Sequence, residues 1–360
     1  MKVWDIIIIG GGAIGSSAAY FLKKMDPSKS ILLLEKRDGF GRGATGSWGS
    51  LIRVFSKYPG VSERSVNTFS YFLNFEEHVG RSCGFVQTGC LYFFSERHRG
   101  EFTKQLDILK SICKTEIHLL NAEEGRVRFP DFQWLDGDYA VYEPQGGYAC
   151  PWATTEAWIE KAKEDGLDSR TTVKVQKLLT EGNRVLGVEI ESGEQLSARR
   201  ILLAGGAGTT RLLTHVDPVQ AEARAIQVNR FHYRSSKNEL PIFLDVDMRA
   251  FGRPAGRCVF YGGYLTDVES KLRSFKQPLS LSEASEAKKR LARRLKTLRT
   301  SELAGGIRAL EMYSKTNDPV LGFSAQYGNL YVATGWSCTG FTLSPYYGER
   351  IASEMLGSFN

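Results

Sequence analysis

Three glycines near the start of the chain have the spacing of a phosphate-binding loop. Gly10, Gly12 and Gly15 form Gly-x-Gly-x-x-Gly directly after an apolar run at residues 6–9. In such a loop the first glycine allows a tight turn, the second lets backbone approach a pyrophosphate, and the third lets the next helix pack closely on the strand. A helix continuing from residue 16 would direct its N-terminal amides and dipole at the phosphates. The spacing therefore predicts a strand, an anion-binding turn and a helix.

Glu35 supplies the second group of this site. It ends another apolar run, residues 31–34, about twenty residues after the last glycine. A carboxylate there binds the ribose hydroxyls of an adenine dinucleotide, whereas a 2′-phosphorylated dinucleotide would want an arginine. A Gly-rich structural turn is the alternative, but it does not explain the two strands, the helix and the terminal acid together. The sequence predicts a βαβ unit for an adenine dinucleotide.

Length and charge set limits on the class of protein. A chain of 360 residues with 42% hydrophobic and 24% charged residues suggests two globular domains. The formal net charge is +7, and the densest basic run is residues 288–296, where Leu291 and Leu295 share one helical face. We expect this run to be a solvated helix face rather than a nucleic-acid or membrane-binding surface.

Cysteine and histidine usage gives no sign of a metal site. The six cysteines include no Cys-x-x-Cys pair and the five histidines are scattered. We therefore expect free thiols in a reducing compartment and no bound metal. No apolar run approaches the ~18 residues of a membrane span, and no signal-peptide cleavage site follows the first strand. The expectation is a soluble cytoplasmic protein, with a homo-oligomer left open.

Periodicity and turn residues predict the other elements. Helices are expected at residues 62–80, 101–113 and 282–298, and from Thr154 and Ser344 onward. Strands are expected as a pair about Gly89, at 171–175, as a hairpin at 184–191 and 195–203, and at 225–231, 242–246, 257–261 and 330–333. The Gly- and Ser-rich loop at 38–50 is long enough to be functional, and its small residues would let backbone amides surround a pyrophosphate.

Two separate regions together resemble the D-amino acid oxidase superfamily of FAD enzymes, the group that includes glycine oxidase and sarcosine oxidase. The first region is the glycine loop with Glu35, followed by a Gly/Ala/Ser-rich segment that ends at Arg53. The second begins with Gly306-Ile307-Arg308 and continues through residues 316–322 to residues 329–345, in the order of that superfamily. Scattered similarity covers essentially the whole chain.

The resemblance implies an α/β fold with two domains. One is a Rossmann-type FAD-binding domain, expected at residues 1–80, 145–215 and 315–360. The other is an α+β substrate-binding domain on a mostly antiparallel sheet, expected at residues 81–144 and 216–314.

FAD is the implied cofactor. The helix from Ser344 would direct its amide dipoles at one end of the flavin ring, which would stabilise negative charge on reduced flavin. The expected FAD contacts lie in the glycine loop, after Glu35, at two strand ends and in the loop before Ser344. They are Gly10, Gly12, Ala13, Ile14, Gly15, Glu35, Lys36, Arg42, Ala44, Thr45, Ser47, Gly49, Ser50, Leu51, Val173, Ala204, Gly205, Ala207, Arg308, Gly335, Ser337, Cys338, Thr339, Gly340, Phe341 and Thr342.

Arg308 is the main expected substrate ligand. It lies where the resembling enzymes carry the arginine that binds the substrate carboxylate, and a guanidinium fork suits bidentate binding of that group. A surface or salt-bridged arginine is the alternative. Arg53 is expected to assist Arg308 or to contact phosphate, and Trp336 is expected at the substrate site.

The sequence departs from the family pattern at three places. No cysteine occurs in residues 309–316, where sarcosine oxidase-like members attach FAD, so FAD is expected to be non-covalent. Phe260 falls close to the oxygen-activating lysine of those members. The tyrosine that several relatives place near Phe251 to hold substrate carboxylate is missing, and Tyr261 or Tyr264 is the expected replacement.

The resemblance implies FAD-dependent oxidation of a C–N bond in a small amino acid or amine. A hydride would pass to flavin N5 and an imine would form, with oxygen as acceptor and hydrogen peroxide as product. No protein acid or base is needed if the amine arrives neutral. Two alternatives stay open: a dehydrogenase that uses a quinone or protein acceptor, and a non-catalytic FAD-binding subunit of a hetero-oligomeric enzyme.

Overall fold

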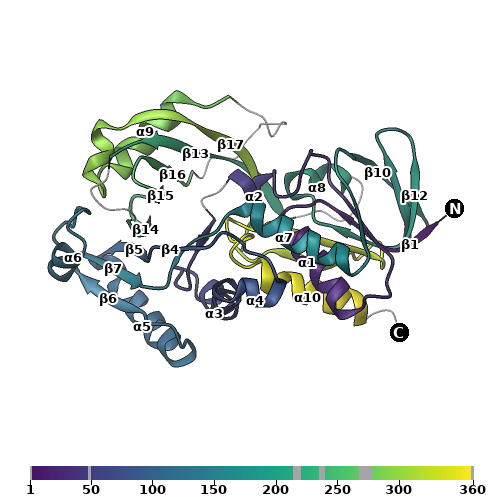
Figure 1. Ribbon diagram of the computed structural model, residues 1–360, viewed down its shortest axis with the longest axis horizontal. Helices are drawn as coiled ribbons and strands as arrows, with labels where there is room; N and C mark the ends of the chain where they lie inside the picture. Colours follow the sequence, from purple (N-terminus) through teal and green to yellow (C-terminus); the bar gives the residue numbers. More distant parts are fainter. Residues whose placement is uncertain (1, 48–49, 214–219, 235–239, 267–277, 358–360) are drawn as a thin grey trace.

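The computed structural model describes residues 2–47, 50–213, 220–234, 240–266 and 278–357. Two eight-stranded sheets stand side by side, each with its own helices (Figure 1). The fold is α/β, with a Rossmann-type sheet on the right of Figure 1 and a mostly antiparallel sheet on the left. The expected fold class is confirmed.

The Rossmann-type sheet is parallel at its centre. β12, β1, β2 and β9 pair in parallel, β19 adds to the end of β12, and the β10–β11 hairpin is antiparallel at the edge. Its strands are β1 (Val3–Ile9), β2 (Ile31–Leu34), β9 (Leu167–Arg170), β10 (Val175–Glu181), β11 (Arg184–Ile190), β12 (Gln195–Leu203), β18 (Val320–Phe323) and β19 (Leu330–Thr334). All four residues of β2 are buried, because layers cover both faces of a parallel sheet.

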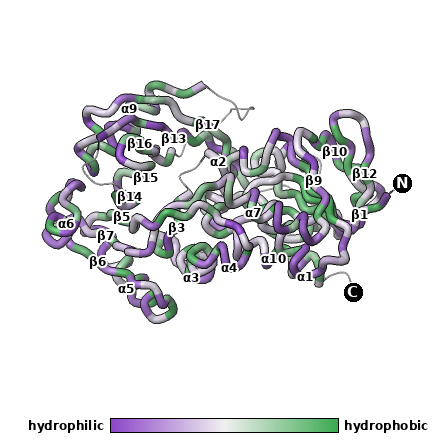
Figure 2. Tube along the Cα trace, in the orientation of Figure 1, coloured by the Kyte–Doolittle hydropathy of each residue, from purple (hydrophilic) through white to green (hydrophobic). Residues whose placement is uncertain are grey.

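Three helices pack together against this sheet. They are α1 (Ala13–Met25), α7 (Pro151–Glu164) and α10 (Ser344–Gly357), and α1 lies between the other two. The Ser17 hydroxyl donates to the Ser344 carbonyl at 2.7 Å. A Cβ added at Gly348 would lie 2.0 Å from that hydroxyl, so a glycine is needed where α10 crosses α1. These helices cover the face of the sheet that carries Ile6, Ile8, Ile31 and Leu33, and Figure 2 shows the apolar stretches of the strands beside them.

The second sheet has the order β17-β13-β16-β15-β14-β5-β7-β6. Within the described residues its one parallel pair is β5 with β14. Its strands are β5 (Cys90–Ser95), β6 (His118–Asn121), β7 (Asp138–Glu143), β13 (Ala221–His232), β14 (Ile242–Asp245), β15 (Ala250–Ala255), β16 (Val259–Tyr264) and β17 (Glu302–Ser314). α9 (Leu281–Leu291) and the 3-10 turn η2 (Lys296–Thr300) cover one face, over a core that includes Phe231, Phe243 and Phe260.

Short elements join the two sheets. β3 (Leu51–Ile52), β8 (Gly147–Tyr148) and β4 (Val86–Gln87) form a small third sheet. Beside it, the fully buried Glu143 carboxylate accepts from the amides of Val54 at 2.6 Å and Phe55 at 2.9 Å. Burial raises the pKa of Glu143. This carboxylate fixes the backbone that follows Arg53.

The remaining helices are short or lie at the edges. They are α2 (Ala44–Ser47), α3 (Pro59–Leu73), α4 (Phe75–Val79), α5 (Glu96–Ile112), α6 (Ala122–Arg128), α8 (Thr209–Leu212) and the 3-10 turn η1 (Gly206–Gly208). The helix expected at 62–80 is therefore two helices, because the chain leaves helical geometry at Asn74.

Two strand predictions are wrong. β4 and β5 flank Gly89 but do not pair with each other: β4 pairs with β8, and β5 pairs with β7 and β14. The strand expected at 171–175 is a turn between β9 and β10, in which Thr172 has a φ of 58°. A left-handed residue breaks a strand even where β-branched residues favour one.

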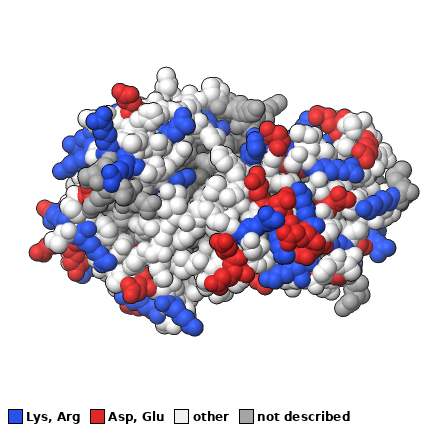
Figure 3. All heavy atoms as spheres, viewed as in Figure 1, with Lys and Arg blue, Asp and Glu red and all other residues white. Residues whose placement is uncertain are grey.

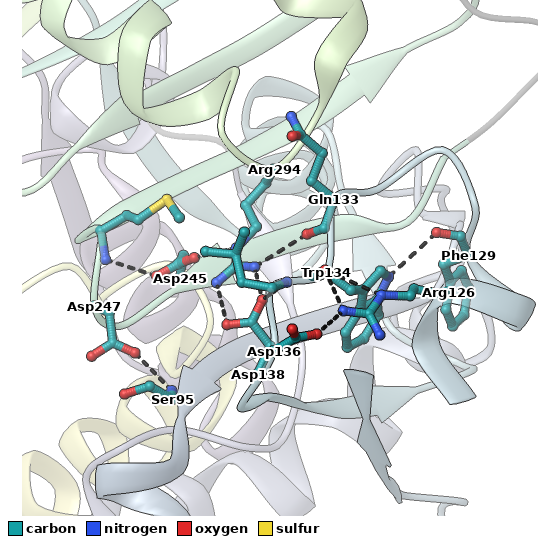
Figure 4. Close-up of polar contacts among 12 residues, drawn as sticks. Ser95, Arg126, Phe129, Gln133, Trp134, Asp136, Asp138, Asp245, Asp247 and Arg294 are labelled. Carbon is teal, nitrogen blue, oxygen red and sulfur yellow. Dashed lines mark hydrogen bonds and ion pairs between the residues drawn. The ribbon is translucent and has the colours of Figure 1, made fainter. Parts of the chain in front are cut away.

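The basic run at 288–296 is only partly the solvated face that was expected. Basic side chains gather over α9 on the surface in Figure 3. α9, however, ends at Leu291, and Arg294 is buried with only 1% of its surface exposed. Its guanidinium forms ion pairs with Asp138 and Asp245 inside the protein (Figure 4).

We propose that the two sheets are the cores of two domains with the boundaries expected above. The first sheet takes its strands from residues 3–34, 167–203 and 320–334, and the second from residues 90–143 and 221–314.

Candidate cofactor and substrate site

The glycine loop joins β1 to α1 through very close backbone contacts. Gly10 has a φ of +107°, and a Cβ there would meet the Ala204 carbonyl oxygen at 2.5 Å. A Cβ at Gly15 would lie 1.8 Å from the Gly10 carbonyl oxygen. A Cβ at Gly12 would lie 3.2 Å from the Thr45 hydroxyl, a tight contact that a small shift of that side chain would relieve, so Gly12 is less enclosed than Gly10 and Gly15.

Glu35 stands at the end of β2 against this loop. Its carboxylate accepts from the Gly11 amide at 2.7 Å and the Arg37 amide at 2.8 Å. Lys36 follows it, and desolvation of its ammonium group by the surrounding protein lowers its pKa. A carboxylate has about four acceptor positions, so Glu35 retains capacity for ribose hydroxyls.

A loop of small residues follows β19 and leads into α10. Ser337 and Cys338 have φ values of 47° and 69°, which non-glycine residues seldom adopt. Neighbouring strand β17 holds them: Cys338 donates its amide to Glu311 at 2.9 Å, and the Tyr313 hydroxyl lies 2.5 Å from the Cys338 sulfur. Backbone held in such geometry is a frequent mark of a ligand site.

One cavity of about 660 Å³ connects these segments. It extends from the glycine loop and Glu35, past the loop after β19, to the inner face of the second sheet. Most of the expected cofactor residues line it: Gly10, Gly12, Ala13, Ile14, Glu35, Lys36, Ala44, Thr45, Ser50, Leu51, Val173, Ala204, Gly205, Ala207, Ser337, Cys338, Thr339, Gly340, Phe341 and Thr342. An elongated cavity with backbone amides at one end and side chains at the other fits a dinucleotide and a small molecule.

Several expected cofactor residues lie outside the lining. Gly15 acts in helix packing, and Gly335, with a φ of +75°, begins the loop after β19. Arg42 forms a surface ion pair with Asp38 at 3.3 Å, and the Ser47 hydroxyl donates to the Gly43 carbonyl. Gly49 lies outside the described residues.

Arg308 does not lie where it was expected. Its guanidinium forms an ion pair with Glu283 of α9 at 2.6 Å, on the outer side of the second sheet, and it is not among the residues that line the cavity. The reason is register: Arg308 pairs with Gln227, whose side chain also contacts the start of α9. Arg308 is thus a salt-bridged arginine, which was the alternative to a substrate ligand at this position.

Two neighbouring aromatic residues also face α9. The Tyr264 ring lies under the Arg290 guanidinium at 4.5 Å, and Phe260 is fully buried in the core beneath α9. Tyr261 lies beside the apolar cluster of Ile226, Val228, Phe251 and Tyr313, but it does not line the cavity. Its ring is covered by the Arg253 guanidinium at 4.8 Å.

Arg53 and Trp336 do line the cavity. The Arg53 guanidinium donates to the Phe55 carbonyl and lies 5.3 Å from the centre of the Tyr92 ring. Within the described part of the chain no carboxylate forms an ion pair with Arg53. Its charge acts on the buried Glu143 carboxylate, whose pKa it lowers against the larger effect of burial.

Most of the wall at the second sheet was not recognised from the sequence. The additional side chains there include Tyr92, Arg224, Leu244, Arg249, Phe251, Glu311 and Tyr313. Arg224 donates to Glu222 at 2.6 Å and covers the Tyr313 ring at 4.6 Å. Among these residues Glu311 gave the clearest indication in the sequence, because it is an acid within the apolar run at 309–313. The face of the sheet on which it lies, however, depends on the pairing of β17 with β13, which the sequence does not reveal.

Two polar groups in this wall are neutral at physiological pH. Burial raises the pKa of the Tyr313 hydroxyl and of the Cys338 thiol well above their ordinary values. All six cysteines are free thiols. In the described ranges no three His, Cys, Asp or Glu side chains are grouped as metal ligands, and no helix there is long and apolar enough to cross a membrane.

Comparisons with known proteins agree with this geometry. The family described as "FAD dependent oxidoreductase" (DAO) matches residues 5–354. Human dimethylglycine dehydrogenase is 25% identical over 276 residues, 74% of this chain and 31% of that protein. The mouse pyruvate dehydrogenase phosphatase regulatory subunit is 21% identical over 98% of this chain and 41% of its own length. The chain therefore spans less than half the length of these two relatives.

A solved structure shows the same fold over nearly the whole molecule. The L-proline dehydrogenase of P. horikoshii superposes with a TM-score of 0.84 at 20% identity, covering 99% of this chain and 94% of that one.

Proposed function

Because the chain belongs to the DAO family of FAD-dependent oxidoreductases, with FAD as its cofactor, we propose that it oxidises the C–N bond of a small amino acid or amine. The product is an imine, which water then hydrolyses. We propose molecular oxygen as the electron acceptor, with hydrogen peroxide formed, and non-covalent FAD.

The observation that carries this proposal is the continuity of the cavity. The residues at its glycine-loop end fit the cofactor, since Gly12 has no side chain to cap the start of α1, where the Ala13 amide donates to the Thr45 hydroxyl at 3.0 Å. Bound FAD would supply the hydride acceptor. The other end of the same cavity is lined by Leu244, Phe251 and Tyr313, which would exclude water from the reacting carbon.

Arg53 is the proposed ligand for the substrate carboxylate, in place of Arg308. It lines the cavity, and Glu143 holds the adjacent backbone through two amides. A guanidinium binds a carboxylate through two parallel hydrogen bonds, which fixes the orientation of the substrate carbon.

No side chain is assigned as acid or base. Tyr313 and Cys338 stay protonated at neutral pH because burial raises both pKa values. In this proposal the amine loses its proton to solvent before it reacts. The contribution of the protein is binding, orientation and exclusion of water.

Two alternatives share the fold. A dehydrogenase would pass electrons to a quinone or a protein, as the name dimethylglycine dehydrogenase suggests for that relative. A non-catalytic FAD-binding subunit is the other, and the name of the regulatory-subunit relative, which matches 98% of the chain, favours it.

Anaerobic mixing of the holoprotein with amines and amino acids tests all three. We expect at least one carboxylate-bearing amine to bleach the oxidised flavin absorption, and admission of air to restore it with peroxide formed. Arg53→Ala should weaken the apparent affinity for that substrate by about 30-fold or more, at unchanged FAD content. Bleaching with slow reoxidation in air would favour the dehydrogenase, and no bleaching by any member would favour the subunit.

A further inference from the structure

The segment that carries Arg53 belongs to no helix or strand. Residues 53–58 connect β3 to α3, and side chains of other elements bind four successive main-chain amides of this segment. The four pairs are Val54 with Glu143, Phe55 with Glu143, Ser56 with the Ser62 hydroxyl at 2.8 Å, and Lys57 with the Tyr92 hydroxyl at 3.2 Å. The conformation of the segment is therefore set by the side chains that surround it.

The peptide unit between Phe55 and Ser56 connects these bonds to the Arg53 side chain. Its carbonyl oxygen accepts from the Arg53 guanidinium, and its amide nitrogen donates to the Ser62 hydroxyl. A peptide unit is planar, so its amide and its carbonyl turn together. The Ser62 hydroxyl, at the opposite edge of that plane, therefore fixes the direction from which the Phe55 carbonyl holds the guanidinium.

Gln105 of α5 holds the Ser62 hydroxyl in turn. Its Nε2 atom donates to Ser62 Oγ at 2.8 Å and to the Ser56 carbonyl at 2.5 Å. The orientation of the Gln105 amide is fixed, because a main-chain carbonyl can only accept. The Ser62 hydroxyl also donates to the Ser56 carbonyl at 3.2 Å, so both backbone groups of Ser56 are bound by side chains from α3 and α5.

Stability alone explains Gln105 poorly. Only 5% of its surface is exposed, and within the described residues its Oε1 atom is buried without a hydrogen-bond partner. A buried acceptor without a partner is unfavourable, and an apolar side chain of the same size would avoid that cost. Neither Gln105 nor Ser62 is among the residues that line the cavity. What the pair does is orient the peptide unit that holds the Arg53 guanidinium.

We propose that Ser62 and Gln105 are positioning residues for Arg53 and thereby determine how strongly the site prefers a carboxylate. They do not touch the substrate. They fix the peptide plane that holds the guanidinium, and a bidentate pair with a carboxylate depends on direction as well as on charge. This inference rests on the proposed function, because it concerns the arginine that is assigned there to the substrate carboxylate.

The test compares two ligands of similar shape that carry no amine to oxidise. The FAD-loaded protein is titrated with propionate and with propionamide, and the shift in flavin absorption gives each Kd. We expect propionate to bind at least about 10-fold more tightly, because only the carboxylate can accept a charge-assisted pair from Arg53. Ser62→Ala removes the acceptor of the Ser56 amide and should lower this ratio by about 5-fold, with the propionamide Kd changed by less than about 2-fold.

A second variant and a matched control accompany Ser62→Ala. Gln105→Met keeps the volume of the side chain and removes only its amide, so it should lower the ratio by about 3-fold. Ser65→Ala removes another buried hydroxyl of α3, one that donates within the helix to the Val61 carbonyl at 2.8 Å, and should leave the ratio unchanged. FAD content and far-UV circular dichroism should be the same in all three variants.

The strictest comparison repeats Ser62→Ala in an Arg53→Ala background. A positioning residue acts only through the residue that it positions, so in this background Ser62→Ala should change neither Kd by more than about 2-fold. A general loosening of the cavity would instead weaken both ligands in both backgrounds.

Three results would overturn the inference alone: equal Kd values for the two ligands in the unmodified protein, a full ratio in Ser62→Ala or Gln105→Met, or an equal loss in Ser65→Ala. A preference for propionate that survives Arg53→Ala would overturn both the inference and the proposed role of Arg53. If no amine bleaches the flavin while the ratio and its dependence on Ser62 persist, the proposed oxidation fails and the positioning of Arg53 stands.

Discussion

The two ends of the cavity are built by different means. The cofactor end is made of backbone from short, local segments, where glycines such as Gly10 and Gly15 bring main-chain atoms into contact. The substrate end is made of side chains such as Arg53, Arg249 and Tyr313, which come from strands and turns far apart in sequence. The shape of the first end is therefore set by the backbone and that of the second end by side chains, so single substitutions should alter the second end more.

This difference has a physical cause in the second sheet. Its main core lies on the outer face, beneath α9, where Phe231, Phe243 and Phe260 are buried. The side chains of the inner face therefore contribute less to the free energy of unfolding than those beneath α9. Substitutions at the cavity wall should alter binding more than folding.

The largest expected effect is in the glycine loop. Gly12→Val places a side chain on the open surface of the loop, so the protein should fold but purify without FAD. Gly15→Ala should instead prevent folding, since its Cβ would lie 1.8 Å from the Gly10 carbonyl oxygen. Flavin absorbance per protein and far-UV circular dichroism separate the two outcomes. A fully loaded yellow Gly12→Val protein would show that this loop does not hold the cofactor.

The next effect is at Arg294. Arg294→Ala leaves the buried carboxylates of Asp138 and Asp245 without their partner, which should lower the free energy of unfolding by about 3–5 kcal/mol. Denaturant unfolding in excess FAD measures it. The matched control is Arg293→Ala at the exposed neighbouring position, expected to change stability by less than about 0.5 kcal/mol. A loss below about 1 kcal/mol for Arg294→Ala would mean that the ion cluster is dispensable.

The smallest effect is expected at Arg308. Arg308→Ala breaks a partly exposed ion pair with Glu283, so stability should fall by less than about 1 kcal/mol. Substrate affinity should change by less than about 2-fold, and Glu283→Gln should behave in the same way. If Arg308→Ala weakens binding of a carboxylate substrate about 10-fold or more while Glu283→Gln does not, the carboxylate ligand is Arg308 after all.

The sequence indicated that the glycine loop and Glu35 meet, as they do at one end of the cavity, because the signals there are local. Gly10, Gly12, Gly15 and Glu35 lie within one βαβ unit, and their spacing alone indicates how they meet. The loop after β19 was expected for the same reason, because the strand, the loop and the helix follow one another directly in the sequence. The α/β class and the mostly antiparallel second sheet were predicted from the family resemblance.

Apart from Arg53 and Trp336, the side chains that line the second-sheet end of the cavity could not be predicted, because register decides which side chains face inward. Moving a strand by one residue exchanges its two faces. The pairing of Arg308 with Gln227 directs it toward α9, and no local signal reports that pairing. Arg294 was misjudged for a related reason: its partners Asp138 and Asp245 come from two distant strands, so a buried ion cluster looks like a basic helix face.

The contact between α1 and α10 has a consequence for how the molecule is made. The Ser17 and Ser344 atoms that meet there are 327 positions apart. At ribosomal rates of about 5–20 residues per second, the first helix waits about 15–65 s for its partner, with apolar surface uncovered. The cavity itself is completed late in synthesis, because residues 336–342 of the loop before α10 form part of its wall.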